Sequence, residues 1–298
     1  MDDIIQLKKL TKAYGSKVVL ENMDLNIPKG SIVGLMGPNG CGKTSLMKIL
    51  TGMINDYSGI VRVDGQPVGP YSKSVTAYLP DRSYLPQWMS ARQCVDYMAD
   101  FFKDFDKPKA VKMLEAFQLE PGQRVKTMSK GMQEKLLLLL TMSRRAKLYV
   151  LDEPLGGVDP SARQFIMDTI LHNRPEGSSM LLSTHMIYDM ERVFDYALMI
   201  GNKRVLLFDS VANLEAQGKT LNELFQEVFP YVGYTAEERL HPDRAHVPVG
   251  AGRGRGGRRN RRAVHADPGG GHGAAGRGPA VELPADPVRG AALRDGPC

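Results

Sequence analysis

The chain has 298 residues, a length that allows one or two domains with a sizeable core, and its formal net charge is +6. No run of about 18 apolar residues occurs, so we expect no transmembrane helix, and the acidic start at residues 1–3 is unlike a signal peptide. The three cysteines lack the spacing of a metal site or a disulfide framework, which favours a reducing cytosol.

Alternating strand and helix patterns run through residues 1–230. Residues 3–35 have strand patterns broken by turns, which predicts a β-rich N-terminal edge. Residues 85–145 are mainly helical and predict a helical subdomain. Further on, strands at 147–151, 179–184 and 196–200 alternate with helices at 160–172 and 187–194. Such alternation indicates an α/β fold with a mostly parallel sheet and helices on its faces.

The composition changes near residue 231. The segment 231–298 has 11 arginines, no lysine and 14 of the 31 glycines, and its excess of arginine over acidic residues supplies four of the six net charges. This composition cannot build a core, so we expect disorder. An arginine- and glycine-rich tract can bind nucleic acid or anionic lipid, whereas an abrupt change in residue usage is typical of a frame-shifted or passive tail. We favour the second interpretation, which makes a nucleic-acid partner unlikely.

A phosphate-binding motif lies at residues 37–44. It fits the pattern G-x-x-x-x-G-K-[ST] with Gly37, Pro38, Asn39, Gly40, Cys41, Gly42, Lys43 and Thr44. The apolar run at 31–36 predicts a strand before it, and 43–50 predicts a helix after it. Glycines let backbone N–H groups turn toward an anion, Lys43 can reach the β- and γ-phosphates, and the Thr44 hydroxyl can ligate Mg²⁺. The motif predicts nucleotide binding.

Two carboxylates and a histidine follow later apolar strands. Asp152 and Glu153 end the strand at 147–151, and His185 follows the strand at 179–184. In a nucleoside triphosphatase the first acid can organise Mg²⁺ and the second can polarise a water molecule. Taken alone, the two acids could equally form a polar turn, and a lone histidine is more often an ordinary surface residue.

The order of these pieces, with Ser129-Lys130-Gly131-Met132 between them, resembles the ATP-binding subunit of an ABC transporter over residues 3–230. The resemblance implies a P-loop NTPase fold with ATP and Mg²⁺ as its ligands. It implies that Tyr14 stacks on adenine, that residues 37–45 form the phosphate loop, and that Asp159 lies in the D-loop. It also implies that Ser45 binds ATP and that Ser129 and Gly131 contact the ATP held by another subunit. In the same family pattern, Asp152 is a metal ligand, Glu153 is the catalytic base and His185 is the switch histidine.

The chain departs from this family's pattern at two places. Lys130 and Met132 replace the first glycine and the glutamine of the usual Leu-Ser-Gly-Gly-Gln signature, a variant that resembles the branch serving ABC-2-type exporters. Asp81 stands where the Q-loop glutamine is expected, and Gln87 follows six residues later. We favour Asp81 as the aligned residue and as a possible contact of Mg²⁺.

The resemblance implies an ATP-hydrolysing subunit that powers a separate transmembrane permease, most simply an exporter, from the cytoplasmic face of the membrane. It also implies a homo- or heterodimer of ATPase subunits. Two other functions stay open, a soluble ABC ATPase in translation or DNA repair and a regulator that binds ATP without hydrolysing it. The absence of an internal repeat and of a heptad insert disfavours the first, and the presence of Glu153 and His185 disfavours the second.

Overall fold

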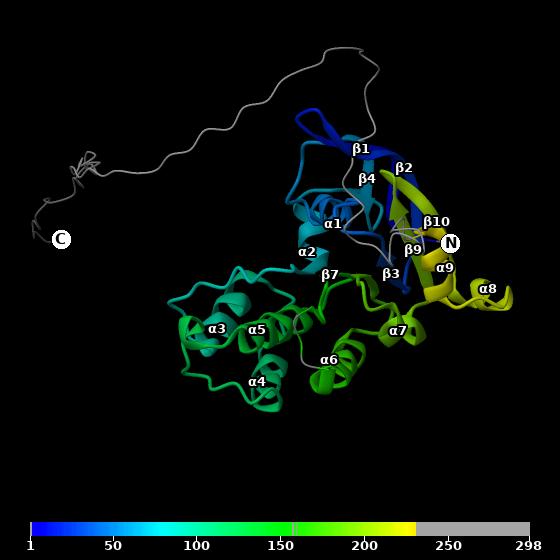
Figure 1. Cartoon of the computed structure of the whole chain (residues 1–298). Coiled ribbons are helices and arrows are strands. Elements are labelled where there is room, and N and C mark those ends of the chain that lie inside the picture. Colours follow the sequence, from blue (N-terminus) through cyan, green and yellow to red (C-terminus); the bar gives the residue numbers. More distant parts are fainter. Residues whose placement is uncertain (1, 157, 159, 231–298) are drawn as a thin grey trace, which may run out of the picture. The chain divides into compact units, whose positions relative to one another are not determined.

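The computed structural model describes residues 2–156, 158 and 160–230 (Figure 1). The predictions for Asp159 and for the tail at 231–298 lie outside these residues.

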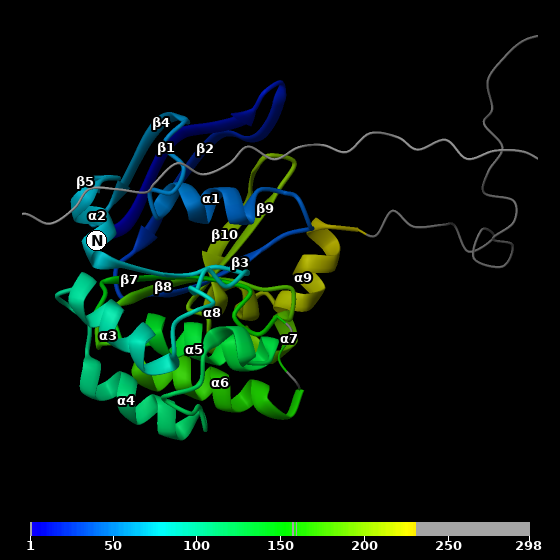
Figure 2. The same cartoon turned by 90° about the vertical axis from the view of Figure 1, so that its left-hand side faces the viewer.

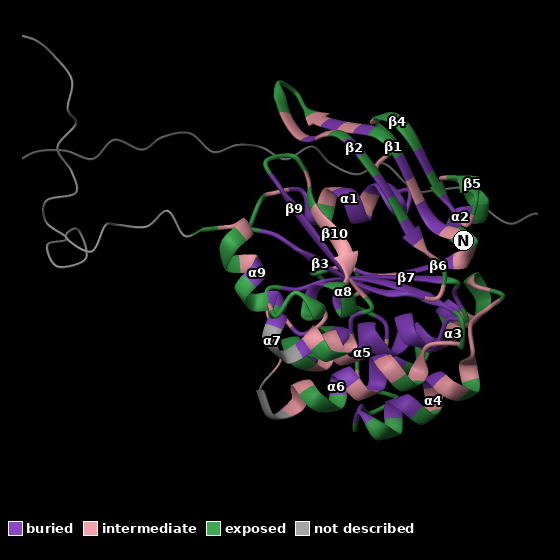
Figure 3. Ribbon diagram, turned by 90° about the vertical axis from the view of Figure 1, so that its right-hand side faces the viewer, coloured by how far each residue is buried: buried purple, intermediate pink, exposed green. Residues whose placement is uncertain are grey.

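A six-stranded sheet forms the centre of the described part, in the order β10-β9-β3-β8-β7-β6. Its strands are β3 (Ile32–Met36), β6 (Thr76–Leu79), β7 (Leu148–Asp152), β8 (Ser179–Ser183), β9 (Tyr196–Gly201) and β10 (Arg204–Ser210). Neighbours from β9 to β6 are parallel, and β10 pairs antiparallel with β9. Every residue of β3, β7 and β8 is buried, as expected for continuous apolar strands covered on both faces (Figure 3).

A second, antiparallel sheet has the order β2-β1-β4-β5. Its strands are β1 (Asp3–Tyr14), β2 (Lys17–Pro28), β4 (Ser58–Val63) and β5 (Gln66–Pro67). This sheet and helix α1 (Lys43–Leu50) lie on one side of β7 and β8, whereas α5 (Lys130–Met142) and α6 (Pro160–Asn173) lie on the other (Figure 2). The described part therefore has the mixed α/β architecture predicted from the sequence.

Alternate residues of the parallel strands build two separate cores. Val150 and Leu181 pack with α1 and the antiparallel sheet. Their neighbours Leu151 and Leu182 pack with the helices of the other face. Successive side chains of a strand point to opposite faces, so each buried strand supplies both cores at once.

The remaining helices are α2 (Pro70–Val75), α3 (Ala91–Phe101), α4 (Lys107–Ala116), α7 (Ile187–Met190), α8 (Val211–Ala216) and α9 (Leu221–Val228). Helices α3, α4 and α5 begin at side-chain caps, because Ser90, Asp106 and Ser129 each accept a hydrogen bond from a backbone N–H in the first turn. The leucine run at 136–140 of α5 is buried in the core. In the described ranges, no helix is both long and apolar enough to cross a membrane.

Three details differ from the sequence prediction. The third N-terminal strand, β3, leaves the β-rich edge and lies in the parallel sheet between β9 and β8. The apolar pattern at residues 75–80 predicts a strand that starts at Val75, but Val75 ends α2 and the strand β6 starts at Thr76. The strand β10 was not predicted, because it owes its place to pairing with β9 across the turn at Asn202 and Lys203, both of which have positive φ angles.

Asp64 joins the two sheets. It sits in the turn between β4 and β5, and its carboxylate lies 2.8 Å from the ammonium of Lys29 and 2.7 Å from that of Lys147, the residue that precedes β7. Tyr71 of α2 also donates a hydrogen bond to it. Burial alone would raise the pKa of Asp64, but the hydrogen bonds from Lys147, Lys29 and Tyr71 outweigh it and hold this pKa well below its usual range.

Asp64→Asn should lower the free energy of unfolding at pH 7 by about 2 kcal/mol, because a charged acceptor of three donors is lost. Asparagine tolerates the left-handed backbone of this turn, in which Asp64 has a φ of 50°. Because the folded-state pKa of Asp64 is lowered, its contribution is complete above the unfolded pKa of about 4 and is lost as the pH falls below it. Urea unfolding of both proteins at pH 7, 5 and 3.5 should show the difference shrinking at the lowest pH.

The matched control is Glu227→Gln, which removes an exposed ion pair with Lys219. It should change the free energy of unfolding by less than about 1 kcal/mol. An Asp64→Asn variant no less stable than this control would contradict the role of Asp64.

Candidate functional site

The phosphate loop connects the end of β3 to the start of α1. Gly37 and Gly42 have φ angles of 153° and 111°, in the range that favours glycine. A Cβ atom at Gly37 would lie 2.3 Å from the carbonyl oxygen of Ile200, and one at Gly42 would lie 2.6 Å from a methyl carbon of Leu20. At both positions the φ angle is unfavourable for a residue with a side chain, and a Cβ atom would also clash, so glycine is required.

The phosphate loop and the start of α1 carry the positive groups of this region. Lys43 is only 8% exposed, and its ammonium donates to the carbonyl oxygens of Gly37 at 2.7 Å and Pro38 at 3.3 Å. Helix α1 has no acidic residue in its first turn and no side-chain cap, so its first N–H groups have no intrahelical partner. This combination is suited to binding a phosphate group.

Tyr14 lies beside the loop at the end of β1. Its hydroxyl oxygen is 3.3 Å from that of Ser45, and its ring is about half exposed. The ammonium of Lys12 lies 4.5 Å from the centre of the same ring. One cation thus orients an exposed aromatic face next to the loop, where a base could stack. Burial raises the pKa of the Cys41 thiol, so this thiol stays neutral near neutral pH.

The acidic pair stands at the end of β7. Asp152 is 2% exposed, and its Oδ1 accepts a hydrogen bond from the hydroxyl of Ser183 at 2.6 Å. Its other oxygen, Oδ2, is buried and accepts no hydrogen bond from the described part of the chain. Glu153 has a φ of 52°, an unusual value for a residue with a side chain. The turn that it makes separates the two neighbouring carboxylates.

Glu153 is paired with the predicted histidine. The Nδ1 atom of His185 lies 2.8 Å from Oε2 of Glu153, although 32 residues separate the two in sequence. His185 follows β8, the strand next to β7 in the sheet. The pairing of these strands explains how the two side chains meet.

A cavity of about 610 Å³ brings most of the predicted site residues together. The predicted residues that line it are Asn39, Gly40, Gly42, Lys43, Thr44, Ser45, Asp81, Asp152, Glu153 and His185. Val19 and Gly156 also line it and were not predicted. Tyr14, Gly37, Pro38 and Cys41 belong to the same region without lining the cavity.

Asp81 and Gln87 occupy different surroundings. Asp81 follows β6 and lines the cavity. Gln87 does not line it, and its amide donates at 3.4 Å to the carbonyl of Leu85. Of the two candidates for the Q-loop position, Asp81 is the one that lines this cavity, and its assignment stays a prediction.

The signature residues lie apart from this cavity. Ser129 caps α5 by accepting a hydrogen bond from Met132 N–H at 3.2 Å. Ser129, Lys130 and Gly131 are exposed, and a Cβ atom at Gly131 would meet only open space. The N-terminus of α5 therefore presents an accessible surface, and Ser129, Lys130 and Gly131 are not among the residues that line the cavity.

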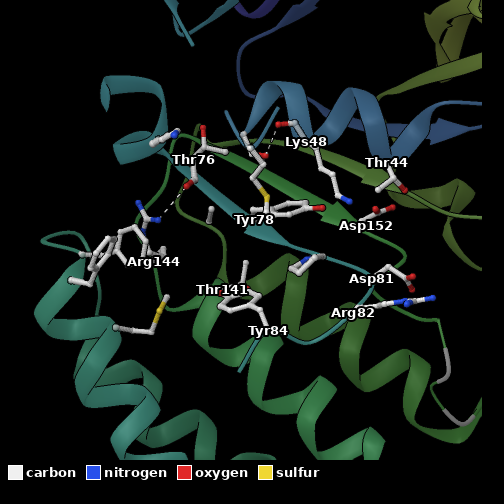
Figure 4. Close-up of a pocket in the computed structure, with 18 residues that line it drawn as sticks. Thr44, Lys48, Thr76, Tyr78, Asp81, Arg82, Tyr84, Thr141, Arg144 and Asp152 are labelled. Atoms are coloured by element: carbon white, nitrogen blue, oxygen red, sulfur yellow. Dashed lines mark hydrogen bonds between the residues drawn. The ribbon is translucent and has the colours of Figure 1, made fainter. Parts of the chain in front are cut away.

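A second cavity, of about 760 Å³, adjoins the first between α1 and the helical subdomain (Figure 4). Thr44, Asp81 and Asp152 line both cavities. Tyr78 of β6 lies here with its hydroxyl directed toward Asp152 (Figure 4). Burial raises the pKa of this hydroxyl, and the negative charges of Asp152 and Asp81 raise it further.

Sequence reasoning missed Ser183 and Tyr78. Ser183 carried a weak signal, since it is the first of three polar residues, 183–185, after an apolar run. Tyr78 carried none, because a tyrosine in a short strand looks like an ordinary core residue.

The chain matches the model of the family described as "ABC transporter" over residues 20–156. It is 30% identical over 219 residues to the lantibiotic transport ATP-binding protein SrtF of Streptococcus pyogenes, covering 71% of this chain and 94% of that protein. It is 29% identical over 212 residues to the Nod factor export ATP-binding protein I of Cupriavidus pinatubonensis, covering 67% of this chain and 64% of that protein.

The fold has solved counterparts. A structure of the ATP-binding subunit of an ABC transporter superposes with a TM-score of 0.70 at 25% identity, and the match covers 76% of this chain and 99% of that one. A nucleotide-free ATP-binding cassette of an ABC transporter superposes with a TM-score of 0.63 at 18% identity. Together with the phosphate loop and the Glu153–His185 pair, these likenesses place the chain in a family of ATP-hydrolysing proteins: it belongs to the ATP-binding subunits of ABC transporters.

Proposed function

We propose that the 610 Å³ cavity binds ATP with Mg²⁺ and that Glu153 activates the attacking water. The observation that carries this proposal is the 2.8 Å contact between Glu153 and His185 beside the phosphate loop. A carboxylate held by a histidine at the site of the γ-phosphate can accept a proton from water. Lys43 and the N–H groups of α1 bind the phosphates.

The residues around Asp152 fit a magnesium ion. A hard cation takes oxygen ligands, and Mg²⁺ is usually bound through one or two carboxylates together with phosphates and water. Asp152 supplies a buried oxygen without a hydrogen-bond partner, and the Thr44 hydroxyl lines the same cavity. When bound, Mg²⁺ would neutralise charge that develops on the β- and γ-phosphates. Asp81 would lie near the ion and influence its affinity.

We infer that a second ATPase subunit completes the site. Ser129 and Gly131 are exposed and lie apart from the cavity, so they can contact ATP held by another copy. The start of α5 offers N–H groups, and Lys130 adds a positive charge there without blocking the helix end, since its side chain is 82% exposed. ATP bound between the cavity of one subunit and the start of α5 of the other would hold the dimer closed until it is hydrolysed.

The second cavity is our candidate for the docking site of the permease. It is lined by apolar side chains of the helical subdomain that include Met98, Phe101 and Phe102, and Phe101 is 66% exposed. Large exposed apolar surface next to a cavity is typical of protein interfaces. Thr44, Asp81 and Asp152 also line the ATP cavity, so docking and nucleotide state can influence each other.

We further propose that the transporter is an exporter, because relatives at about 30% identity are named for lantibiotic transport and Nod factor export. The permease would hold the ATPase at the membrane surface. Its substrate pocket would belong to the permease.

Glu153→Gln should keep ATP affinity within a few-fold and lower the hydrolysis rate by at least 100-fold, because an amide cannot act as a base. The variant should also accumulate as an ATP-bound dimer, measured by light scattering after size exclusion. A variant that hydrolyses ATP at the normal rate would remove Glu153 from this role.

Asp81→Asn should change the Mg²⁺ concentration for half-maximal hydrolysis about 10-fold while ATP affinity stays within twofold, because a charge at the cavity is removed. Gln87→Ala is the matched control and should alter neither quantity. Magnesium titrations of the hydrolysis rate of both variants test this prediction. If Gln87→Ala changes the Mg²⁺ dependence and Asp81→Asn does not, the Q-loop position belongs to Gln87.

Phe101→Glu should weaken assembly with the permease and abolish stimulation of hydrolysis by it, because a charge would be placed in the apolar docking surface. The basal hydrolysis of the isolated subunit should stay within twofold. Leu206→Glu is the control, since Leu206 is also exposed but lies on β10, at the opposite edge of the sheet from β6. Equal co-purification of permease with both variants would contradict the docking site.

A further inference from the structure

Ser183 lies at the junction of three strands that carry the site. It is the last residue of β8 and is fully buried. Across one side of β8 it is the register partner of Asp152 in β7, and across the other it is the partner of Leu35 in β3, just before the phosphate loop. None of the roles proposed above uses this residue.

The hydroxyl of Ser183 serves both acidic residues. It donates a hydrogen bond of 2.6 Å to Oδ1 of Asp152 and accepts one of 3.0 Å from the backbone N–H of Glu153. The same N–H also lies 3.2 Å from the carbonyl oxygen of Ser183. A hydroxyl has one proton to donate and lone pairs to accept, so both functions of this group are engaged.

The bond to Asp152 fixes which oxygen stays available. Because Oδ1 is occupied by Ser183, the buried Oδ2 is the oxygen left without a partner. A carboxylate held by one oxygen cannot rotate freely, so the other oxygen keeps a constant direction. A metal ligand that is oriented in this way binds its ion more tightly than a mobile one.

The bond from Glu153 fixes the turn of the main chain. Glu153 has a φ of 52°, which costs energy for a residue with a side chain. Both oxygen atoms of Ser183 accept its N–H and so stabilise this conformation. The turn directs the Glu153 side chain to His185 while Asp152 remains buried.

We propose that Ser183 is a positioning residue for ATP hydrolysis, in which one hydroxyl orients the metal-binding carboxylate of Asp152 and the catalytic carboxylate of Glu153 together. This inference rests on the proposed function of the cavity. It implies two separable defects when the hydroxyl is removed, one in metal affinity through Asp152 and one in turnover through Glu153.

The chain contains a matched control on the same strand. Ser179 begins β8, is 1% exposed, and uses its hydroxyl to accept a hydrogen bond of 2.8 Å from the N–H of Gly30. It therefore has the same residue type, strand and degree of burial as Ser183, and it lies at the end of β8 away from the cavity. Loss of either hydroxyl should reduce stability similarly, and the loss at Ser183 should also affect the reaction.

The test compares Ser183→Ala and Ser179→Ala in the full-length chain. Binding of a fluorescent ATP analogue in EDTA should stay within twofold of wild type for both variants, which shows that the phosphate loop is intact. Electron paramagnetic resonance of Mn²⁺ with bound nucleotide should show affinity about 10-fold weaker for Ser183→Ala. At saturating Mg²⁺, kcat of this variant should remain about 10- to 100-fold below wild type with KM for ATP little changed. Ser179→Ala should match wild type in all three measurements.

The outcomes separate this inference from the proposed function. If Ser183→Ala matches Ser179→Ala in Mn²⁺ affinity and kcat, or if it loses metal-free nucleotide binding and melts much earlier, the hydroxyl is only structural and the inference is overturned. Introducing Ser183→Ala into Glu153→Gln should still weaken Mn²⁺ binding, because the bond to Asp152 is independent of the Glu153 side chain. Normal hydrolysis by the Glu153→Gln single variant would instead contradict the role of Glu153 as the base. The effect of Ser183→Ala on Mn²⁺ affinity would still test the bond between Ser183 and Asp152.

Discussion

The parallel pairing of β3, β8, β7 and β6 is the constraint on which the candidate site depends. Parallel strands end at the same edge of a sheet, so the segments that follow them meet there. The phosphate loop follows β3, His185 follows β8, Glu153 follows β7 and Asp81 follows β6. A shift of register by one residue would turn the alternating side chains of a strand to the opposite face and separate the groups that now converge.

The same sheet is also the boundary between two cores, and this arrangement places the two cavities side by side. The cavity that we propose to bind ATP is lined by the start of α1, and the 760 Å³ cavity extends from α1 to α3 and α5. Arg144 follows α5 and donates hydrogen bonds to the carbonyl oxygen of Thr76, the first residue of β6 (Figure 4), and to that of Ser74 in α2. It also donates to Asp104 within the helical subdomain. Its guanidinium also lies 3.8 Å from the ring centre of Phe102. The bond to Thr76 connects the helical subdomain to β6, and Asp81 lies two residues beyond the end of that strand.

The proposed dimer follows from the separation, within one chain, of the residues that line the cavity from the signature residues Ser129 and Gly131. The groups that we propose to bind phosphate and to activate water line one cavity, whereas Ser129 and Gly131 are exposed at the start of α5. The Ser129 side chain accepts a hydrogen bond from Met132 N–H, so this N–H belongs to the cap, whereas Lys130 and Gly131 are exposed at the start of the helix. A ligand that fills the cavity of one subunit could in this way order the contact with another.

The amino-acid sequence alone predicted the fold class and the phosphate-loop motif, and the resemblance to ABC ATPases supplied the proposed roles of Asp152, Glu153 and His185. Local patterns predict the fold class and the loop, since apolar runs and glycine spacing are visible without contacts, whereas two acids after a strand and a lone histidine have ordinary alternatives. Other features became visible only in the three-dimensional structure. There, β3 lies in the parallel sheet and β10 pairs with β9. Asp81 lines the cavity, whereas Gln87 does not. The structure also revealed Ser183, whose hydroxyl reaches Asp152 across 31 residues of sequence. The physical reason is that strand pairing joins residues at long sequence separation, and no local pattern records which strand becomes the neighbour of which.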